Sequence, residues 1–214
     1  SYREHTQSEA AGETHVPQRE EDMDLAPVID LSRAPGERDA WDRSPIVVYL
    51  WAICERIFVT NSWQISSRLR VGVLRLFGAQ IGEKVIMRPR TRVSFPWKLQ
   101  VGDNTWIGEG VWIHNQAPVR LGHDVVVSQD TFITTGSHAV RRDMALITKP
   151  VVIEPGAWVT ARCVVLGGAV IGRSAIVAPL TCVSGYVPPG VIWGSEGARG
   201  PRFSGDGNQG PDHG

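Results

Sequence analysis

The second half of the chain repeats with a period of six residues. An aliphatic residue opens each six-residue unit, or hexad, and a small or β-branched residue stands four positions later. The aliphatic positions are Val101, Ile107, Ile113 and Val119, then Leu121, Val127 and Ile133 after a slip of two residues, and Ile153, Val159, Val165, Ile171, Val177 and Val183 after a longer break. This hexapeptide repeat predicts a parallel β-helix, in which every hexad makes one short strand and one turn.

The period has a direct structural meaning. Each strand pairs only with the strands one coil above and below it, at a spacing of about 4.8 Å. The first residue of each hexad points inward, and the fifth points inward near a corner where only a small side chain fits. Turn residues fill the rest, as at Gly102-Asp103-Asn104. A β-sandwich is the alternative, but its strands recur about every 8–12 residues, so we predict an all-β fold built as a β-helix.

Composition agrees with one main domain that carries attached segments. The chain has 214 residues, and its 22 basic residues balance 22 acidic ones, so total charge gives no argument for nucleic-acid binding. Three cysteines without a Cys-x-x-Cys pair are expected to be reduced, which favours the cytosol. No signal peptide is visible in the sequence.

The sequence divides into four regions. Residues 1–43 are charged and have no apolar period, so they are predicted to be a disordered N-terminal extension. Residues 44–78 have helical spacing of apolar residues and are predicted to form a helical cap. Residues 79–193 hold the β-helix, with a loop over residues 136–150. The Gly-rich polar residues 194–214 are predicted to be a flexible tail outside the core.

The helical region allows two interpretations. Ser44-Pro45 is typical of a helix start, and Asn61 with Gln64 resembles a capping box that opens a second helix. The apolar stretch is shorter than the roughly 20 residues that span a bilayer. Its tryptophans and arginines are nevertheless residue types that interfacial helices use. We favour a pair of helices that covers the open end of the β-helix, with peripheral membrane association as the alternative.

The break in the repeat between Ile133 and Ile153 indicates a functional site. About fifteen residues leave the coil there, and long loops in compact solenoids are usually functional. His138 stands at the base of this loop. An imidazole can accept a hydroxyl proton near neutral pH, so His138 is a candidate general base, although a solvated loop histidine is the alternative explanation.

Several segments together resemble one family. They are Leu76-Phe77-Gly78, Pro96-Trp97-Lys98-Leu99, the stretch 106–113, Gly136-Ser137-His138 and Ile147-Thr148-Lys149-Pro150. Over roughly residues 45–193 the chain resembles the WcaF-like colanic acid biosynthesis acetyltransferases and, more broadly, the hexapeptide-repeat acyltransferases that include galactoside and maltose acetyltransferases. The resemblance implies a left-handed β-helix and a homotrimer whose active sites lie between neighbouring prisms.

The resemblance also implies a reaction and its co-substrate. Acetyl-coenzyme A would donate an acetyl group to a sugar hydroxyl in exopolysaccharide or cell-envelope glycan biosynthesis. His138 would take the hydroxyl proton while the oxygen attacks the thioester directly. The residues that would contact the cofactor are Trp158, Ala161, Pro179 and Ser184, with Arg199 as a phosphate contact. Relatives often carry a lysine where this chain has Gly185 after Ser184, which motivates the choice of Arg199.

The acceptor side gives a weaker pattern. Trp112, His114 and Asn115 lie on a hexad before the loop and are candidate substrate-binding residues, with an ordinary turn as the alternative interpretation. The acceptor would be a saccharide, free or lipid-linked, and a basic cluster could meet a lipid-linked diphosphate. That cluster is Arg88, Arg90, Arg92 and Lys98. The expected location is the cytoplasm or the inner face of the membrane.

Two other functions are compatible with the same fold. A non-catalytic trimeric scaffold with a decayed cofactor groove would explain the missing lysine and the altered ending after Gly194. A zinc hydratase like the γ-type carbonic anhydrases would need three converging histidines. His114, His123 and His138 lack the spacing of such a site, so no metal is expected.

Overall fold

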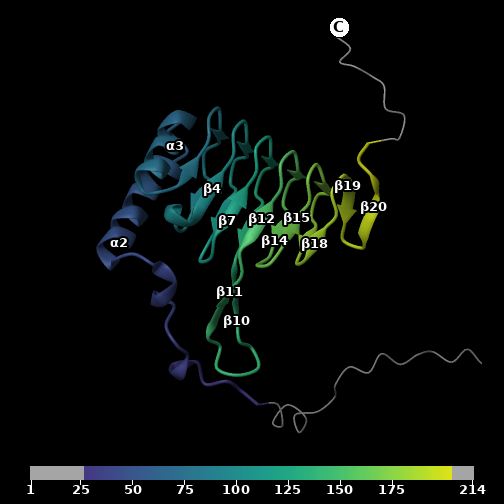
Figure 1. Ribbon diagram of the computed structural model, residues 1–214. Coiled ribbons are helices and arrows are strands. Elements are labelled where there is room, and N and C mark those ends of the chain that lie inside the picture. Colours follow the sequence, from purple (N-terminus) through teal and green to yellow (C-terminus); the bar gives the residue numbers. More distant parts are fainter. Residues whose placement is uncertain (1–26, 204–214) are drawn as a thin grey trace, which may run out of the picture.

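The computed structural model describes residues 27–203 and confirms the predicted fold, a left-handed parallel β-helix with a helical segment at its N-terminal end (Figure 1). The helical elements are η1 (Leu31–Arg33), η2 (Arg38–Trp41), α2 (Pro45–Cys54), η3 (Glu55–Val59, a π-helical turn), α3 (Ser67–Leu76) and η4 (Pro96–Lys98). The coil that follows has the shape of a three-sided prism, and each side is one sheet whose strands are parallel, apart from the last strand of one side.

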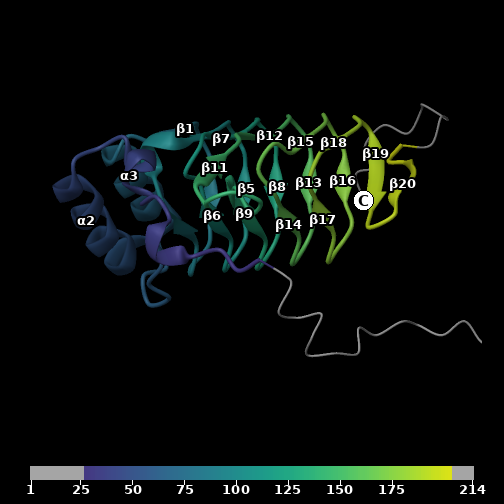
Figure 2. The same ribbon diagram turned by 90° about the horizontal axis from the view of Figure 1, so that it is seen from below.

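The three sheets are named here face A, face B and face C. Face A contains β1 (Gln80–Ile81), β4 (Leu99–Val101), β7 (Val119–Leu121), β12 (Val151–Ile153), β15 (Val170–Ile171) and β18 (Tyr186–Val187). Face B contains β2 (Ile86–Met87), β5 (Trp106–Ile107), β8 (Val126–Val127), β13 (Trp158–Val159), β16 (Ile176–Val177), β19 (Val191–Gly194) and β20 (Gly197–Pro201). Face C contains β3 (Arg92–Val93), β6 (Trp112–His114), β9 (Phe132–Thr134), β14 (Val164–Val165) and β17 (Cys182–Val183). Figure 2 shows the coils stacked along the prism.

The core follows the predicted columns. Ile113, Ile133 and Val165 pair in register on successive coils of face C, and all three are buried. The slip in the repeat arises because Val119 and Leu121 both point inward from the three-residue strand β7. Coils before the loop carry two more residues than the first coil after it, in which Ile153 pairs with Ile171, and four more than the last coil, in which Ile171 pairs with Val187.

Two segments that the sequence predicted to be unstructured are ordered within the described residues. Residues 31–41 contain η1 and η2, and Lys98 Nζ holds the segment by an ion pair with Asp42 Oδ2 at 2.8 Å. At the other end, β20 pairs antiparallel with β19, because the last strand of face B would otherwise present an unpaired edge. Residues 1–26 and 204–214 of the two segments lie outside the described residues.

The helices cover the open end of the first coil. Trp51 and Leu74 are buried, and Trp51 Nε1 donates a hydrogen bond to the Val93 carbonyl at 2.8 Å. The second helix begins at Ser67, with the Ser66 hydroxyl accepting from Leu69 N, rather than at the predicted Asn61. The Asn61 side chain instead accepts from Trp63 N within the connecting turn. Among the described residues, no helix has the length and apolar character needed to cross a bilayer.

A buried arginine joins the helical cap to the β-helix. Arg70 is fully buried on α3, and burial lowers the pKa of its guanidinium. The guanidinium donates to the backbone carbonyls of Val59 at 2.9 Å and of Met87 and Asn61 at 3.3 Å each, and also to the Gln64 carbonyl. One side chain thus satisfies carbonyls of η3, the connecting turn and β2.

Glu55 gives the stability of the cap a dependence on pH. Burial raises the pKa of this carboxyl above its ordinary value, although the hydrogen bond from Val93 N (2.7 Å) and the charges of Arg92 and Arg56 act in the opposite direction. Because the folded-state pKa is raised, the stabilising contribution of protonated Glu55 is present at acid pH and is lost as the pH rises through that value.

Glu55→Gln is therefore expected to raise the thermal unfolding midpoint near neutral pH. The amide oxygen still accepts from Val93 N, but it carries no buried charge. The gain should shrink towards acid pH, where the wild-type carboxyl is also neutral. Thermal unfolding at several pH values measures this, with the exposed Glu83→Gln as control. A lower midpoint for Glu55→Gln at neutral pH would show that the arginines more than compensate the burial.

Candidate active site

The break in the repeat forms a β-hairpin that projects from the edge between face C and face A. Its strands are β10 (Gly136–His138) and β11 (Leu146–Thr148), and they pair antiparallel (Figure 1). Backbone hydrogen bonds from Thr135 N to the His114 carbonyl (3.1 Å) and from Lys149 N to the Thr135 carbonyl (3.0 Å) fix its base. The predicted loop at 136–150 is thus a hairpin anchored on the rigid prism.

His138 is held by the backbone at the outer end of β10. Its Nδ1 lies 2.9 Å from the Met144 carbonyl oxygen. A carbonyl can only accept a hydrogen bond, so Nδ1 carries the proton in the neutral ring and Nε2 keeps a free lone pair. The side chain is 42% exposed. Met144 adopts a left-handed backbone conformation with φ of +57° at this contact. The hairpin therefore presents a proton acceptor to solvent in a defined tautomer.

A carboxylate from the N-terminal segment lies next to this imidazole. Glu37 Oε1 is 3.8 Å from His138 Nε2, and Glu37 Oε2 accepts a hydrogen bond from Gln116 Nε2 at 3.1 Å. Lys98 Nζ donates to the Gln116 carbonyl at 2.6 Å and supports the same corner. The sequence does not indicate a role for Glu37, because one glutamate in a charged segment carries no local signal that it lies near a histidine far along the chain.

His114 and Trp112 lie beside the hairpin on face C, where His114 pairs with Thr134 across β6 and β9. Burial lowers the pKa of His114, the charge of Glu37 raises it, and Arg92 lowers it. His114 Nδ1 is 2.9 Å from the Ser94 hydroxyl. Trp112 stacks between the Arg92 guanidinium, 4.2 Å from the ring centroid, and Phe132, at 4.8 Å between centroids. Both residues remain candidates for an acceptor site.

Asn115 is a structural residue, so its prediction as a substrate contact was wrong. It is fully buried, and its amide bonds both backbone groups of Phe95, accepting from Phe95 N at 2.9 Å and donating to the Phe95 carbonyl at 2.7 Å. The Asn115 side chain thus fixes the backbone of Phe95 at this corner of the prism.

One predicted cofactor residue lies at the base of the hairpin. Ser184 lines a cavity of about 310 Å³ together with Thr135, Ser137, Gly167 and Lys149. Lys149 is exposed, and its aliphatic stem passes over Gly168, where an added Cβ would lie 3.2 Å from the Lys149 Cδ. Lys149 thus supplies a cation beside Ser184. The sequence does not indicate this, because the two residues lie 35 positions apart and only the coiling of the chain brings them together.

The remaining predicted cofactor residues lie elsewhere on the same protomer. Trp158 is on face B, and its Nε1 donates to the Ser128 hydroxyl at 2.9 Å. Ala161 and Pro179 lie on the edge between face B and face C, where Leu180 N donates to the Ala161 carbonyl at 3.2 Å. Arg199 is exposed on β20. Face B lies across the prism from the hairpin edge, so this group and His138 do not meet within one protomer.

The basic cluster is largely occupied by contacts within the chain. Lys98 is almost buried and bonds Asp42 and Gln116, Arg90 pairs with Glu109 at 2.8 Å, and Arg92 stacks on Trp112. These contacts speak against a diphosphate site at the cluster. Only Arg88 lines a separate hollow, on face B.

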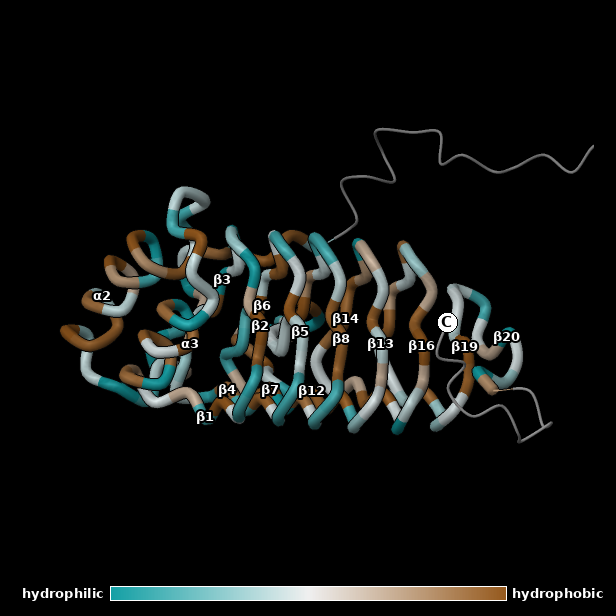
Figure 3. Tube along the Cα trace, turned by 90° about the horizontal axis from the view of Figure 1, so that it is seen from above, coloured by the Kyte–Doolittle hydropathy of each residue, from teal (hydrophilic) through white to brown (hydrophobic). Residues whose placement is uncertain are grey.

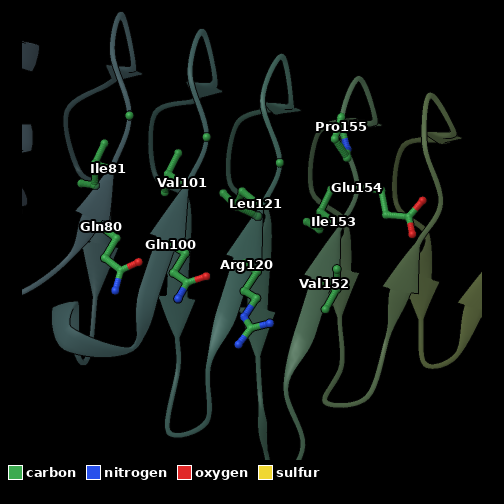
Figure 4. A pocket seen from close by; sticks show the side chains of 13 residues that line it. Gln80, Ile81, Gln100, Val101, Arg120, Leu121, Val152, Ile153, Glu154 and Pro155 are labelled. Carbon is green, nitrogen blue, oxygen red and sulfur yellow. The ribbon is translucent and has the colours of Figure 1, made fainter.

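A second hollow, on face A, has a volume of about 570 Å³, and the column Gln80, Gln100, Arg120 and Val152 lines it (Figure 4). None of the predicted site residues lines this hollow. Within residues 27–203 no three His, Cys, Asp or Glu side chains are grouped as metal ligands. His123 bonds Asp124 on a turn that follows face A, at 2.6 Å.

The chain is similar to acetyltransferases in sequence and in structure. The acetyltransferase WcaF of Escherichia coli K12, which is named for colanic acid biosynthesis, is 32% identical over 148 residues, covering 69% of this chain and 81% of that protein. A galactoside O-acetyltransferase of Lactococcus lactis is 23% identical over 74% of this chain and 76% of its own length. A hexapeptide-repeat acetyltransferase from Vibrio cholerae, solved with acetyl-coenzyme A, is 25% identical with a TM-score of 0.65, over 77% of this chain and 96% of that one. No family model matches. The chain belongs to the WcaF-like hexapeptide-repeat acetyltransferases.

Proposed function

We propose that the protein transfers the acetyl group of acetyl-coenzyme A to a saccharide hydroxyl in exopolysaccharide or cell-envelope glycan biosynthesis. The observation that carries this proposal is the orientation of His138, whose Nδ1 donates to the Met144 carbonyl and whose Nε2 is left free in an exposed position. The acetyl-coenzyme A complex of the Vibrio cholerae relative supports the choice of donor. Cys54, Cys163 and Cys182 are all free thiols, which supports the cytoplasm as the proposed location.

The proposed reaction is a direct displacement with general-base assistance. His138 Nε2 takes the proton of the acceptor hydroxyl as that oxygen attacks the thioester carbonyl carbon. The carbon–sulfur bond breaks, and the coenzyme A thiolate recovers a proton from the imidazolium. The negative charge of Glu37, 3.8 Å from Nε2, stabilises the imidazolium while it exists.

The site is completed between subunits of a proposed homotrimer. Face B carries an outward column of apolar side chains that a single prism leaves exposed or half-buried, with Trp106 55% exposed. The column is Ile86, Trp106, Val126, Trp158, Ile176 and Ile192. Such a continuous apolar face is typical of an interface. The cofactor would pass between His138, Ser184 and Lys149 of one subunit and Trp158, Ala161, Pro179 and Arg199 of its neighbour.

The acceptor is proposed to bind between Glu37 and the rings of His114 and Trp112. A sugar needs convergent polar groups over an apolar floor, and Trp112 supplies such a floor. Glu37→Gln is expected to raise the KM for the acceptor about tenfold, because it replaces a charged hydrogen-bond acceptor with a neutral one, and to lower kcat, because the imidazolium of His138 loses the charge that stabilises it. The KM for acetyl-coenzyme A should stay unchanged. Steady-state kinetics with Asp39→Asn, on the same segment, as control test this. Equal effects on both KM values would place Glu37 outside the acceptor site.

Two measurements test the proposed function. Calorimetry tests the binding of acetyl-coenzyme A, and a thiol-release assay screens nucleotide sugars and lipid-linked saccharides as acceptors. We expect binding and acceptor-dependent thiol release. An absence of binding by the intact trimer would contradict the proposal and favour a non-catalytic scaffold, which the missing phosphate-binding lysine near Ser184 first suggested.

A further inference from the structure

The outer side of the helical cap carries apolar side chains that no described part of the chain covers. They lie on α2 and η3 with helical spacing, and each is at least half exposed: Ile46, Tyr49, Leu50, Ile53 and Ile57. Trp51 points from the same helix into the core of the cap. Figure 3 shows α2 largely brown at the end of the prism. An α-helix that is apolar on all sides is typically buried, so we expect another surface to cover these exposed side chains.

The apolar surface continues beyond α2. Trp63 and Ile65, in the turn before α3, are 92% and 86% exposed. Leu69 and Leu76 on α3, which packs against η3, are exposed as well. Single exposed apolar residues are common, but an extended set of them marks an interaction surface.

Positive charge borders this apolar surface although the whole chain is neutral. Residues 43–76 contain five arginines and one acidic residue, Glu55. Arg43, Arg56 and Arg68 are exposed, and none of them takes part in the ion pairs formed among residues 27–203. Glu55 turns inward and accepts from Val93 N. The cap therefore presents apolar side chains together with three exposed arginines that form no ion pair among the described residues.

We infer that this cap surface docks in the plane of an anionic lipid bilayer. The surface is defined by Ile46, Tyr49, Leu50, Ile53, Ile57, Trp63 and Ile65 with Arg43, Arg56 and Arg68. The apolar side chains enter the boundary between headgroups and acyl chains, and the arginines meet lipid phosphates. A second copy of the cap would bring like charges together, which opposes self-association. The exposed Trp63 is a residue type enriched at membrane interfaces.

The biological purpose of this docking rests on the proposed function. Docking of the cap would place the enzyme at the membrane, where a lipid-linked saccharide acceptor is located. Three-fold symmetry about an axis along the prisms would set three such caps at one end of the trimer. Three linked surfaces bind a vesicle much more tightly than one, since the second and third contacts are intramolecular.

Co-sedimentation with vesicles tests the inference without using the reaction. The full chain, free of acetyl-coenzyme A, is mixed with vesicles of one part phosphatidylglycerol to two parts phosphatidylcholine, and in parallel with pure phosphatidylcholine vesicles. We expect binding to the anionic vesicles that weakens with salt. Ile53→Glu should reduce the partition coefficient about tenfold or more, and the double variant Arg56→Glu/Arg68→Glu about a hundredfold. Leu180→Glu, at a similarly exposed apolar position outside the cap, should bind like the wild type.

Several outcomes would overturn the inference. They are absence of binding to the anionic vesicles, equal binding to both vesicle types, or equal losses in Leu180→Glu and Ile53→Glu. Light scattering without vesicles provides a further overturning outcome. If Ile53→Glu halved the particle mass, the cap surface would bind a second copy of the chain and not a membrane. Unchanged unfolding midpoints establish that the variants fold. Thiol release with a soluble acceptor is measured separately, so failure of the transferase proposal and failure of membrane docking are distinguishable.

Discussion

His138→Ala is expected to lower kcat by about 10²–10⁴, the usual value of general-base assistance. The variant removes the free Nε2 that the Met144 carbonyl orients, while the hairpin keeps its backbone pairing through Gly136, Ser137 and Thr148. The loss corresponds to about 3–5 kcal/mol of transition-state stabilisation. Single-turnover measurement of thiol release, with acetyl-coenzyme A binding followed by calorimetry, separates the chemical step from binding.

His123→Ala is the matched control for this experiment. His123 is also exposed and also hydrogen-bonded, to Asp124, but it lies on a turn of another edge of the prism. Its replacement should leave kcat within about twofold of the wild type, as for a surface residue away from the site. A His138→Ala variant that retains full activity would remove the general base from the proposed mechanism. Equal losses in both variants would indicate a general effect on folding instead.

Arg70→Met is expected to destabilise the protein by about 3 kcal/mol, because buried carbonyls lose a charged donor. Methionine fills part of the space of the arginine stem but donates no hydrogen bond to Val59, Met87 or Asn61. For a chain of this size the unfolding midpoint should fall by about 6–12 °C. Thermal unfolding followed by circular dichroism measures the change.

Arg68→Met, two residues earlier on the same helix, separates burial from charge. Arg68 is exposed, so its replacement should move the midpoint by little. If Arg70→Met unfolds at the wild-type temperature, the carbonyls of the cap must be satisfied in another way, and Arg70 would not join the cap to the prism.

The sequence predicts the core of this fold well because the period itself is the structural rule. Every hexad repeats the same environment, so Ile113 and Val165 can be placed inside the prism from spacing alone. Turns are less regular. Asn104 and Asp124 adopt positive φ as expected of turn residues, but Lys84 and Leu180 do so as well, and nothing in their chemistry indicates it.

The site is predicted less completely because its parts come from distant segments. His138 can be proposed as a candidate from the sequence because the break in the period marks it. Glu37 is not, because its approach to His138 depends on Lys98 and Trp97 holding the N-terminal segment on the prism. Asn115 was misassigned for a related reason, since local sequence does not show whether an amide bonds a ligand or the backbone of Phe95.

The oxygen that fixes the tautomer of His138 belongs to the peptide backbone at Met144. A substitution at Met144 changes the side chain but leaves the backbone carbonyl in place. The backbone path of the hairpin, and not the type of residue at position 144, therefore determines which nitrogen of His138 can accept a proton. Side chains at the tip of the hairpin can therefore vary with the acceptor, whereas inserting or removing one residue there should move the oxygen and lower kcat by at most the amount expected for His138→Ala.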